Sequence, residues 1–346
     1  MNLYMPYTNY HILLSLAIAM ANSALEHQLI LVNPSLKRLC NIFNLKNIHV
    51  VSLRYDDRRN NIHSFCIKKH NLHFLANELK CIDSVSDCFY CCEWHVYTTY
   101  LIHLIRKMSA SSTRFCLIED GVSTYVEPVR KKKNVMERLG NYILYGSWHK
   151  DFYRPGMMVP NCDVYALLPD LLGKNFNNNI KHLINFNYLL ENLNEVALSE
   201  IVDESNRSYD PNIKALIALD FNSRYTRGEV YRQTMLQLIY EIAQRYSSIA
   251  IKRHPADDKS IDFIPVGVNN VFELDAKLPI EFYYLKFRKT LKMVVGSLST
   301  SLLTAHCMLP DIQVLSTISR ENIKNEPQAP MIIELFNKLG IETKVI

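Results

Sequence analysis

The chain has 346 residues, 48% of them hydrophobic, with 39 basic and 34 acidic side chains and a formal net charge of +5. This composition excludes a disordered or collagen-like chain, and the length predicts two globular domains of similar size. Only 9 glycines are present, and neither a G-x-G-x-x-G fingerprint nor a Walker loop occurs. The mild positive charge suits an acidic substrate or an anionic membrane surface, but no basic stripe with interleaved aromatic residues indicates nucleic-acid binding.

The cysteines and the start of the chain predict a cytoplasmic protein. The 9 cysteines are odd in number and scattered, which favours reduced thiols over a disulfide framework. The opening MNLYMPYTNY carries no positive charge, unlike a signal peptide. The apolar run His11–Ala21 is about half as long as a spanning helix, so we interpret it as a buried helix.

Strand and helix patterns alternate along the first half of the chain. Short runs of β-branched and apolar residues are separated by longer helical patterns, which is typical of a parallel sheet with right-handed crossovers. The predicted strands are Leu3–Pro6, Gln28–Val32, Ile48–Leu53, Asp87–Cys91 and Arg114–Ile118.

The second half repeats this alternation after a polar stretch that ends near Pro211. We predict a first domain of residues 1–208, a second of 209–325, and a C-terminal helical segment, 326–346, that packs back on the first domain. Two α/β domains facing across a cleft would place functional groups at the carboxyl ends of their strands. The predicted elements here are strands Ala215–Leu219, Ile249–Lys252 and Leu291–Val295, and helices Glu229–Tyr246, Ser301–Leu309 and Met331–Leu339.

Two carboxylates, Glu119 and Asp120, stand directly after a predicted strand and before Gly121. Successive strand side chains point to opposite faces, so only one of the two should face a substrate. A carboxylate in this position can act as general base toward a hydroxyl group. The alternative is an acidic turn without a catalytic role.

A second polar cluster, Lys252–Arg253–His254–Pro255, follows another strand. Pro255 favours an extended conformation for His254 and so defines the position of its imidazole. With its two cationic neighbours, this histidine could hold and protonate a leaving phosphate. A surface turn is the simpler alternative.

The third cluster, Gly296–Ser301, lies between a strand and a helix. Hydroxyl groups and unpaired N–H groups at a helix N-terminus favour an anion, because the helix dipole adds to their effect. Ordinary N-capping by Ser299 or Thr300 is the alternative.

Four residues, Cys88, Cys91, Cys92 and His95, have spacing similar to that of zinc ligands. No second ligand pair follows at the spacing of a zinc finger. Buried thiols in a strand that leads into a helix are ordinary core residues, so no metal site is predicted.

A base, a cationic acid and a phosphate cradle, each at the end of a strand, together indicate a group-transfer site. The motifs Glu119–Asp120–Gly121, His254–Pro255 and Ser299–Thr300 resemble those of bacterial sialyltransferases of GT-B fold, the group of glycosyltransferase family 52 lipooligosaccharide sialyltransferases and capsular polysialyltransferases. The opening Thr8–Ala19 also resembles the first strand-loop-helix of that group. The resemblance implies an α/β protein with two Rossmann-like domains.

The same resemblance implies roles for the motif residues. Asp120 would be the general base that deprotonates the acceptor, supported by Glu119. His254, followed by Pro255, would bind the nucleotide phosphate and act as acid toward it.

Further residues would complete nucleotide binding in this resemblance. Ser299 and Thr300 would hold the phosphate, with Ser297 a weaker candidate. Glu281 in Pro279–Ile280–Glu281 resembles a P-x-E element that binds ribose hydroxyls, although a helix start explains it equally well.

The implied reaction is an inverting transfer of sialic acid from CMP-sialic acid to a hydroxyl of lipooligosaccharide or capsule, with a lipid-linked acceptor and no metal or other cofactor. The chain has no Asp-x-Asp pair for a metal-bound nucleotide, and it is shorter than the capsular polymerases, which favours addition of a single residue. The alternatives are a GT-B transferase that uses CMP-Kdo or a nucleotide diphosphate sugar, and a catalytically silent glycan-binding protein of the same fold.

Two sets of basic residues have less defined roles. The run Arg130–Lys133 is interpreted as a solvated loop, with contact to an anionic glycan or to the inner membrane as the alternative. Arg224 and Arg227 follow a strand of the second half and could meet the donor carboxylate.

Overall fold

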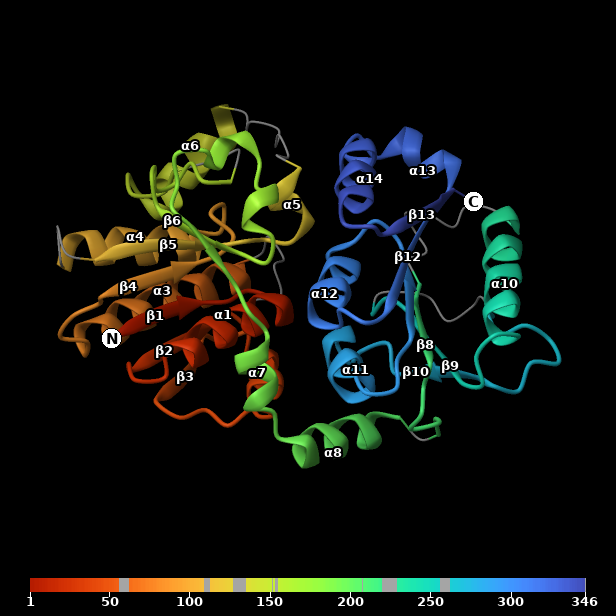
Figure 1. Cartoon of the computed structure of the whole chain (residues 1–346). Coiled ribbons are helices and arrows are strands. Elements are labelled where there is room, and N and C mark those ends of the chain that lie inside the picture. The colour runs from red at the N-terminus through yellow and green to blue at the C-terminus, as the bar shows by residue number, and fades with distance from the viewer. Residues whose placement is uncertain are drawn as a thin grey trace. The chain divides into compact units, whose positions relative to one another are not determined.

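The structure is a computed structural model of the whole chain, and it describes residues 1–55, 62–108, 113–126, 135–150, 152, 155–206, 208–219, 229–255 and 262–345. The chain divides into two compact units, Met1–Leu193 and Asn194–Ile346. Each unit is built around one parallel sheet (Figure 1), as the alternation of strand and helix patterns predicted.

The first unit contains a seven-stranded sheet in the order β3-β2-β1-β4-β5-β6-β7, with every neighbouring pair parallel. Its strands are β1 Asn2–Met5, β2 His27–Leu31, β3 Ile48–Ser52, β4 Asp87–Tyr90, β5 Arg114–Ile118, β6 Asp163–Ala166 and β7 Lys181–Leu183. Its α-helices are α1 Asn9–Ala21, α2 Lys37–Cys40, α3 Ile62–Lys80, α4 Val96–Met108, α5 Val122–Tyr125, α6 Val135–Tyr145 and α7 Asn187–Glu191.

Helix α1 accounts for the apolar run near the start of the chain. Thr8 is its N-cap and accepts a hydrogen bond from the backbone N–H of His11. Every residue from Tyr10 to Met20 is buried, so the helix is largely apolar on all sides because it lies inside the unit. Across the described ranges of the chain, no helix combines the length and the hydropathy needed to span a bilayer.

The second unit contains a six-stranded parallel sheet in the order β10-β9-β8-β11-β12-β13. Ile217, Ile239, Ile251 and Val295 belong to its buried core, which the strands share with α10. The strands are β8 Ala215–Ala218, β9 Ile249–Lys252, β10 Val271–Leu274, β11 Met293–Gly296, β12 Gln313–Ile318 and β13 Glu342–Val345. The helices are α8 Glu195–Ser205, α10 Glu229–Ala243, α11 Ile280–Phe287, α12 Thr300–Met308, α13 Arg320–Asn325 and α14 Ala329–Lys338.

The structure differs from the predicted domain bounds in two places. Helix α8 belongs to the second unit, where it packs on α11 and its Glu195 pairs with Arg288. The unit boundary therefore falls after Leu193 and not after residue 208. The segment 326–346 is also part of the second unit, because β13 pairs with β12 and forms the edge of that sheet.

Both sheets reverse their direction of growth at one point, between β1 and β4 in the first unit and between β8 and β11 in the second. In open parallel sheets, ligands bind outside the carboxyl ends of the strands at such a switch point. The loops that follow β1, β4, β8 and β11 are therefore where each unit is expected to carry its functional groups.

Candidate functional site

The loop after β5 fixes the position of Asp120. The strand ends at Ile118, and three residues later Gly121 has φ 64° and ψ −148°, a conformation that residues with a Cβ atom rarely adopt. The backbone N–H of Asp120 donates to Thr124 Oγ1 at 2.7 Å, and Ser123 Oγ donates to the Asp120 carbonyl at 2.8 Å. A glycine turn and two hydrogen bonds thus hold this residue at the carboxyl end of the sheet.

The two adjacent carboxylates have different surroundings, as the alternation of strand side chains predicted. Glu119 is fully buried and accepts hydrogen bonds from Tyr10 Oη, Tyr125 Oη and, at 2.9 Å, the backbone N–H of Leu167. Burial raises the pKa of its carboxyl to about 7, although these hydrogen bonds act in the opposite direction. The Asp120 side chain is 27% exposed, so of the two carboxylates it is the one accessible to a substrate.

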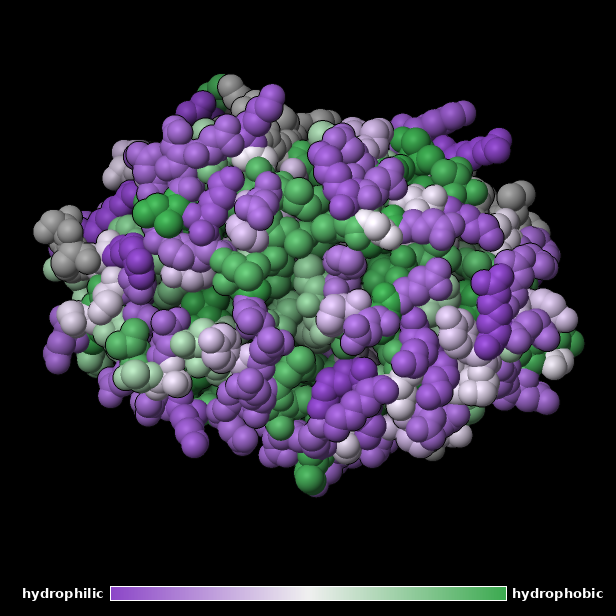
Figure 2. All heavy atoms as spheres, viewed as in Figure 1, coloured by the Kyte–Doolittle hydropathy of each residue, from purple (hydrophilic) through white to green (hydrophobic). Residues whose placement is uncertain are grey.

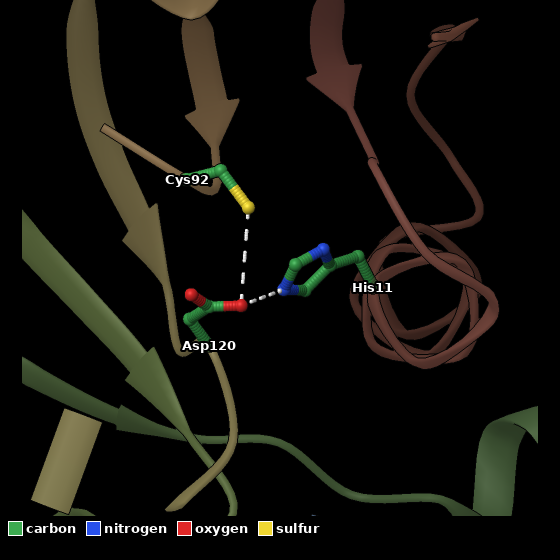
Figure 3. Close-up of side chains that lie close together, drawn as sticks. All are labelled: His11, Cys92 and Asp120. Atoms are coloured by element: carbon green, nitrogen blue, oxygen red, sulfur yellow. Dashed lines mark hydrogen bonds and ion pairs between the residues drawn. The ribbon is translucent and has the colours of Figure 1, made fainter. Parts of the chain in front are cut away.

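Two residues that were not predicted as site residues lie against Asp120 (Figure 3). The Nε2 atom of His11, on α1, is 2.9 Å from Asp120 Oδ1. The Sγ atom of Cys92, just after β4, is 3.8 Å from the same oxygen. The three side chains therefore meet at the carboxyl ends of β1, β4 and β5, beside the switch point of the first sheet.

The cysteines with zinc-like spacing separate in the fold. Cys88 and Cys91 are fully buried, and burial raises the pKa of both thiols well above the usual range. The ring of His95 packs against Tyr7, with 4.3 Å between ring centroids. Of these four residues, Cys92 is the one that lies beside other candidate ligands, which are His11 on α1 and Asp120 in the loop after β5.

In the second unit, His254 and Pro255 follow β9 and are exposed. Their predicted cationic neighbours point into the unit. Lys252 Nζ donates to the carbonyls of Arg253 and Ala276 at 3.2 and 3.1 Å, and burial lowers its pKa to about 8.

Arg253 is also buried, and its Nε donates to Glu273 Oε1 at 3.0 Å. Lys252 and Arg253, the cationic neighbours that were expected to assist His254, are therefore both engaged inside the unit. His254 alone of the three is exposed.

The third cluster follows β11 and leads into α12. Ser299 is the N-cap residue, but its hydroxyl makes no capping hydrogen bond and lies 2.7 Å from Ser301 Oγ. Thr300 is the first residue of the helix, and Ser297 accepts a hydrogen bond from the Ser299 N–H through its carbonyl. Simple capping by the Ser299 side chain therefore does not account for this motif.

Glu281 lies in the first turn of α11, after the N-cap residue Pro279, which agrees with the helix-start interpretation. Burial raises the pKa of its carboxyl, and the nearby Lys252 opposes that effect.

The predicted residues thus form one group in each unit. Glu119 and Asp120 belong to the first, and His254, Pro255, Glu281 and the Ser297–Thr300 loop belong to the second. The ends of β9 and β11 lie at the same edge of the second sheet, with β8 between them. The convergence of residues 120, 254 and 299–300 on one pocket stays a prediction, and residues 130–133, 224 and 227 lie outside the described ranges.

Comparison with solved structures finds the same fold at low sequence identity. The UDP-GlcNAc 2-epimerase from Methanocaldococcus jannaschii is 12% identical with a TM-score of 0.54, covering 100% of this chain and 89% of its own. A putative UDP-N-acetylglucosamine 2-epimerase from Listeria monocytogenes is 12% identical with a TM-score of 0.54, and the match covers 96% of this chain and 81% of that one. A glycotransferase of kitacinnamycin is 10% identical with a TM-score of 0.53, and the match covers 99% of this chain and 84% of that one. These likenesses, with the two parallel-sheet units, show a GT-B fold and nothing about the substrate.

No curated protein sequence matches the chain. Residues 7–317, nearly the whole chain, match the family described as Alpha-2,8-polysialyltransferase (POLYST). This match confirms the predicted resemblance at the level of that family and supports glycosyl transfer, while the glycosyltransferase family 52 and lipooligosaccharide relationships stay predictions. Because the match runs from just after β1 almost to the end of β12 in a chain of GT-B fold, the protein belongs to the alpha-2,8-polysialyltransferase family of glycosyltransferases.

Proposed function

We propose that the protein transfers sialic acid from CMP-sialic acid to a hydroxyl group of a cell-surface glycan, with inversion at the anomeric carbon and Asp120 as general base. The observation that carries this proposal is the contrast between the two adjacent carboxylates. Glu119 is sealed by hydrogen bonds, whereas Asp120 is partly exposed at the carboxyl end of β5. Membership of the polysialyltransferase family supports sialic acid as the transferred sugar.

In the proposed reaction, the acceptor oxygen forms a bond to the anomeric carbon as the bond from that carbon to the CMP oxygen breaks. Asp120 takes the proton of the attacking hydroxyl, and CMP leaves with the electron pair of the broken bond. His254 donates a proton or a hydrogen bond to the departing phosphate. Glu119 supports Asp120 indirectly, because its hydrogen bonds to Tyr10 and Tyr125 tie α1 and α5 to the loop that carries the base.

The second unit supplies the proposed nucleotide site. Ser299 and Thr300, with Ser297, would bind the phosphate at the start of α12, and Glu281 would bind the ribose hydroxyls. These roles place the phosphate charge beside hydroxyl groups and a helix N-terminus, which favour an anion. The proposal requires that both units act on one donor–acceptor pair, and it assigns no step to a metal ion.

The direct test is CMP release by the purified chain from CMP-sialic acid, with sialylated oligosaccharides and truncated lipooligosaccharide as separate acceptors. Release that depends on an acceptor supports the proposal, and mass spectrometry of the product distinguishes a single residue from a polymer. Release from CMP-Kdo or from a nucleotide diphosphate sugar, but not from CMP-sialic acid, would assign the chain to another GT-B donor. No turnover and no thermal shift with any nucleotide would favour a silent glycan-binding protein.

The proposal includes peripheral contact with the inner membrane, where a lipid-linked acceptor resides. Helix α6 supports it, because none of its residues is buried and its apolar residues at 135, 139, 142 and 143 share one helical face. Val135 and Ile143 are 77% and 73% exposed. In Figure 2, the region where Figure 1 shows α6 is mainly hydrophilic on the side facing the viewer, with a few hydrophobic residues among the polar ones. The run Arg130–Lys133 precedes this helix in the sequence, and its charge suits anionic lipids.

Membrane contact is tested by cosedimentation with phosphatidylcholine vesicles with and without phosphatidylglycerol. We expect binding that requires the anionic lipid and that Ile143→Ser weakens severalfold. Val266→Ser, which changes a fully exposed valine of the second unit, is the matched control. Binding that is unchanged in Ile143→Ser, or dimerisation through α6 detected by light scattering, would contradict a membrane role for this helix.

A further inference from the structure

The cluster formed by His11, Cys92 and Asp120 has the composition of a transition-metal site. Each residue offers one ligand atom, and the imidazole nitrogen, the thiol sulfur and the carboxylate oxygen all lie within 4.8 Å of one another (Figure 3). Among the described residues, this is the one group of three or more histidine, cysteine or acidic side chains that meets in this way.

The imidazole of His11 is buried without a hydrogen bond. The residue is 0% exposed, and neither ring nitrogen has a hydrogen-bond partner among the described residues. Nε2 lies 2.9 Å from Asp120 Oδ1, but the two atoms are not aligned as donor and acceptor. A buried polar group that makes no hydrogen bond is unfavourable, and a cation that accepts the lone pair of Nε2 would remove part of that cost.

Cys92 presents its thiol from an unusual backbone conformation. Its φ of 50° lies in the left-handed region, which is rare for a residue with a side chain. The carbonyl of Cys92 accepts a hydrogen bond from the backbone N–H of His95 at 2.9 Å, which helps to hold this turn after β4. Strained residues of this kind persist where the surrounding structure enforces them, and they cluster at ligand sites.

The charges suit zinc, and the distances would need shifts of only about 0.2–0.4 Å. Zinc bonds of about 2.0 Å to nitrogen and oxygen and about 2.3 Å to sulfur separate tetrahedral ligand atoms by roughly 3.3–3.6 Å. The observed Nε2–Oδ1 and Sγ–Oδ1 distances, 2.9 and 3.8 Å, lie on either side of this range. A thiolate and a carboxylate neutralise the two charges of the ion, and a thiolate ligand disfavours magnesium.

We propose that His11, Cys92 and Asp120 bind a zinc ion with three protein ligands, and that this ion blocks glycosyl transfer. Cys92 releases its thiol proton to solvent when the ion binds. The 27% exposure of the Asp120 side chain leaves room for a fourth ligand, such as water. The inhibitory part rests on the proposed function, because a carboxylate that donates its lone pair to zinc no longer accepts the proton of the acceptor.

Binding is tested on the full chain, stripped of metal with a chelator and kept reduced, by calorimetric titration with zinc chloride. We expect one zinc ion per chain, and affinities lowered more than about tenfold by Cys92→Ser and by His11→Gln. Cys81→Ser, which changes an exposed thiol of the same unit, is the matched control and should bind zinc as the wild type does. Absence of stoichiometric binding, or equal binding by Cys92→Ser, would overturn the site.

Cobalt(II) provides a spectroscopic test that does not depend on activity. We expect strong visible absorption typical of tetrahedral cobalt, with a thiolate-to-cobalt charge-transfer band that Cys92→Ser removes and Cys81→Ser retains. A weak octahedral spectrum without this band would overturn the ligand assignment. Because His11 is buried, circular dichroism must first show that His11→Gln is folded. If that variant is unfolded, Cys92→Ser alone decides the test.

The inhibition is tested by measuring the rate of CMP release of each protein with zinc and comparing it with the rate of the same protein without zinc. Stoichiometric zinc should abolish turnover of the wild type and of Cys81→Ser, with recovery after chelation. Zinc that binds through Cys92 without slowing turnover would overturn the inhibitory role. Zinc that binds through Cys92 to a chain without transferase activity would support the metal site and contradict the proposed function.

Discussion

The two units present their candidate groups in different ways at the carboxyl ends of their strands. In the first unit, Asp120 stands beside the buried His11 and next to Glu119, whose carboxylate is enclosed by three donors. In the second unit, His254 is exposed and its basic neighbours Lys252 and Arg253 point inward. The position of the proposed base is therefore fixed by the fold before any substrate arrives, whereas among the proposed phosphate ligands His254 is exposed and Ser297, Ser299 and Thr300 are half-buried.

This difference suits the two tasks that we propose. A general base works best when partial burial and fixed neighbours define its position and its proton affinity. A site for a charged nucleotide must exchange water for phosphate, and an exposed histidine at a strand end with half-buried hydroxyl groups at a helix start allows that exchange. The variants below test whether the division between the units holds.

The largest effect is expected from Asp120→Asn. The amide keeps the shape of the side chain but cannot accept the proton of the acceptor, so kcat should fall by about 10²- to 10⁴-fold. Because Asp120 belongs to the first unit, the affinity for CMP measured by calorimetry should change less than about twofold. Unchanged turnover would show that Asp120 is not the base. A parallel loss of CMP affinity would contradict the assignment of nucleotide binding to the second unit alone.

His254→Ala should reduce both turnover and CMP binding, because the imidazole is proposed to contact the phosphate in the bound and reacting states. Loss of one such donor is expected to lower kcat by about 10²- to 10³-fold. Arg245→Ala is the matched control, since Arg245 is exposed and precedes β9, whereas His254 follows it. CMP binding by His254→Ala at wild-type strength would contradict the phosphate role.

Glu119→Gln should change how stability depends on pH. The folded pKa of Glu119 is about 7, above its ordinary value of 4.5, because the carboxyl is buried. Below about pH 4.5 both states hold the proton, whereas between about pH 4.5 and 7 mainly the unfolded chain loses it. Stability of the wild type should therefore fall through this window, by about 3 kcal/mol from this one residue.

Urea denaturation of wild type and Glu119→Gln at about pH 5 and about pH 8 measures this contribution. The variant should lose less stability between the two values than the wild type does. Asp120→Asn, which changes the partly exposed neighbour, is the control. Equal pH dependence in wild type and Glu119→Gln would mean that Glu119 ionises as readily in the folded chain as in the unfolded one.

The smallest effect is expected from the N-cap of α1. Thr8→Ala removes the hydrogen bond from the His11 N–H and should cost about 1 kcal/mol of stability. Asn194 caps α8 of the second unit in the same way, through the N–H of Ala197, so Asn194→Ala should lose a similar amount. Because His11 lies against Asp120, Thr8→Ala should also lower kcat, whereas Asn194→Ala should not. Equal kcat values for the two variants would show that the cap of α1 does not affect the site.

Most of the central strands were predicted because they are largely apolar runs, but the interior strands β6 and β12 and the edge strand β10 were missed. Arg114–Ile118 and Ile249–Lys252 agree with the predicted bounds, and β1, β2 and β4 agree within one residue at each end. The edge strands β7 and β13, Lys181–Leu183 and Glu342–Val345, were missed because their sequences KHL and ETKV lack such a run. Without β13, the sequence offered no reason to place residues 326–346 in the second sheet.

The sequence by itself determined the alternation that builds two parallel sheets and placed each acidic, histidine or hydroxyl motif at the end of a strand, because both follow from local patterns. Only the tertiary structure decided which carboxylate is sealed and which is accessible, and that His11 and Cys92 lie against Asp120. The physical reason is that β1, β4 and β5 are neighbours only through pairing across the sheet. Side chains separated by 28 and 109 residues become contacts only when those strands assemble.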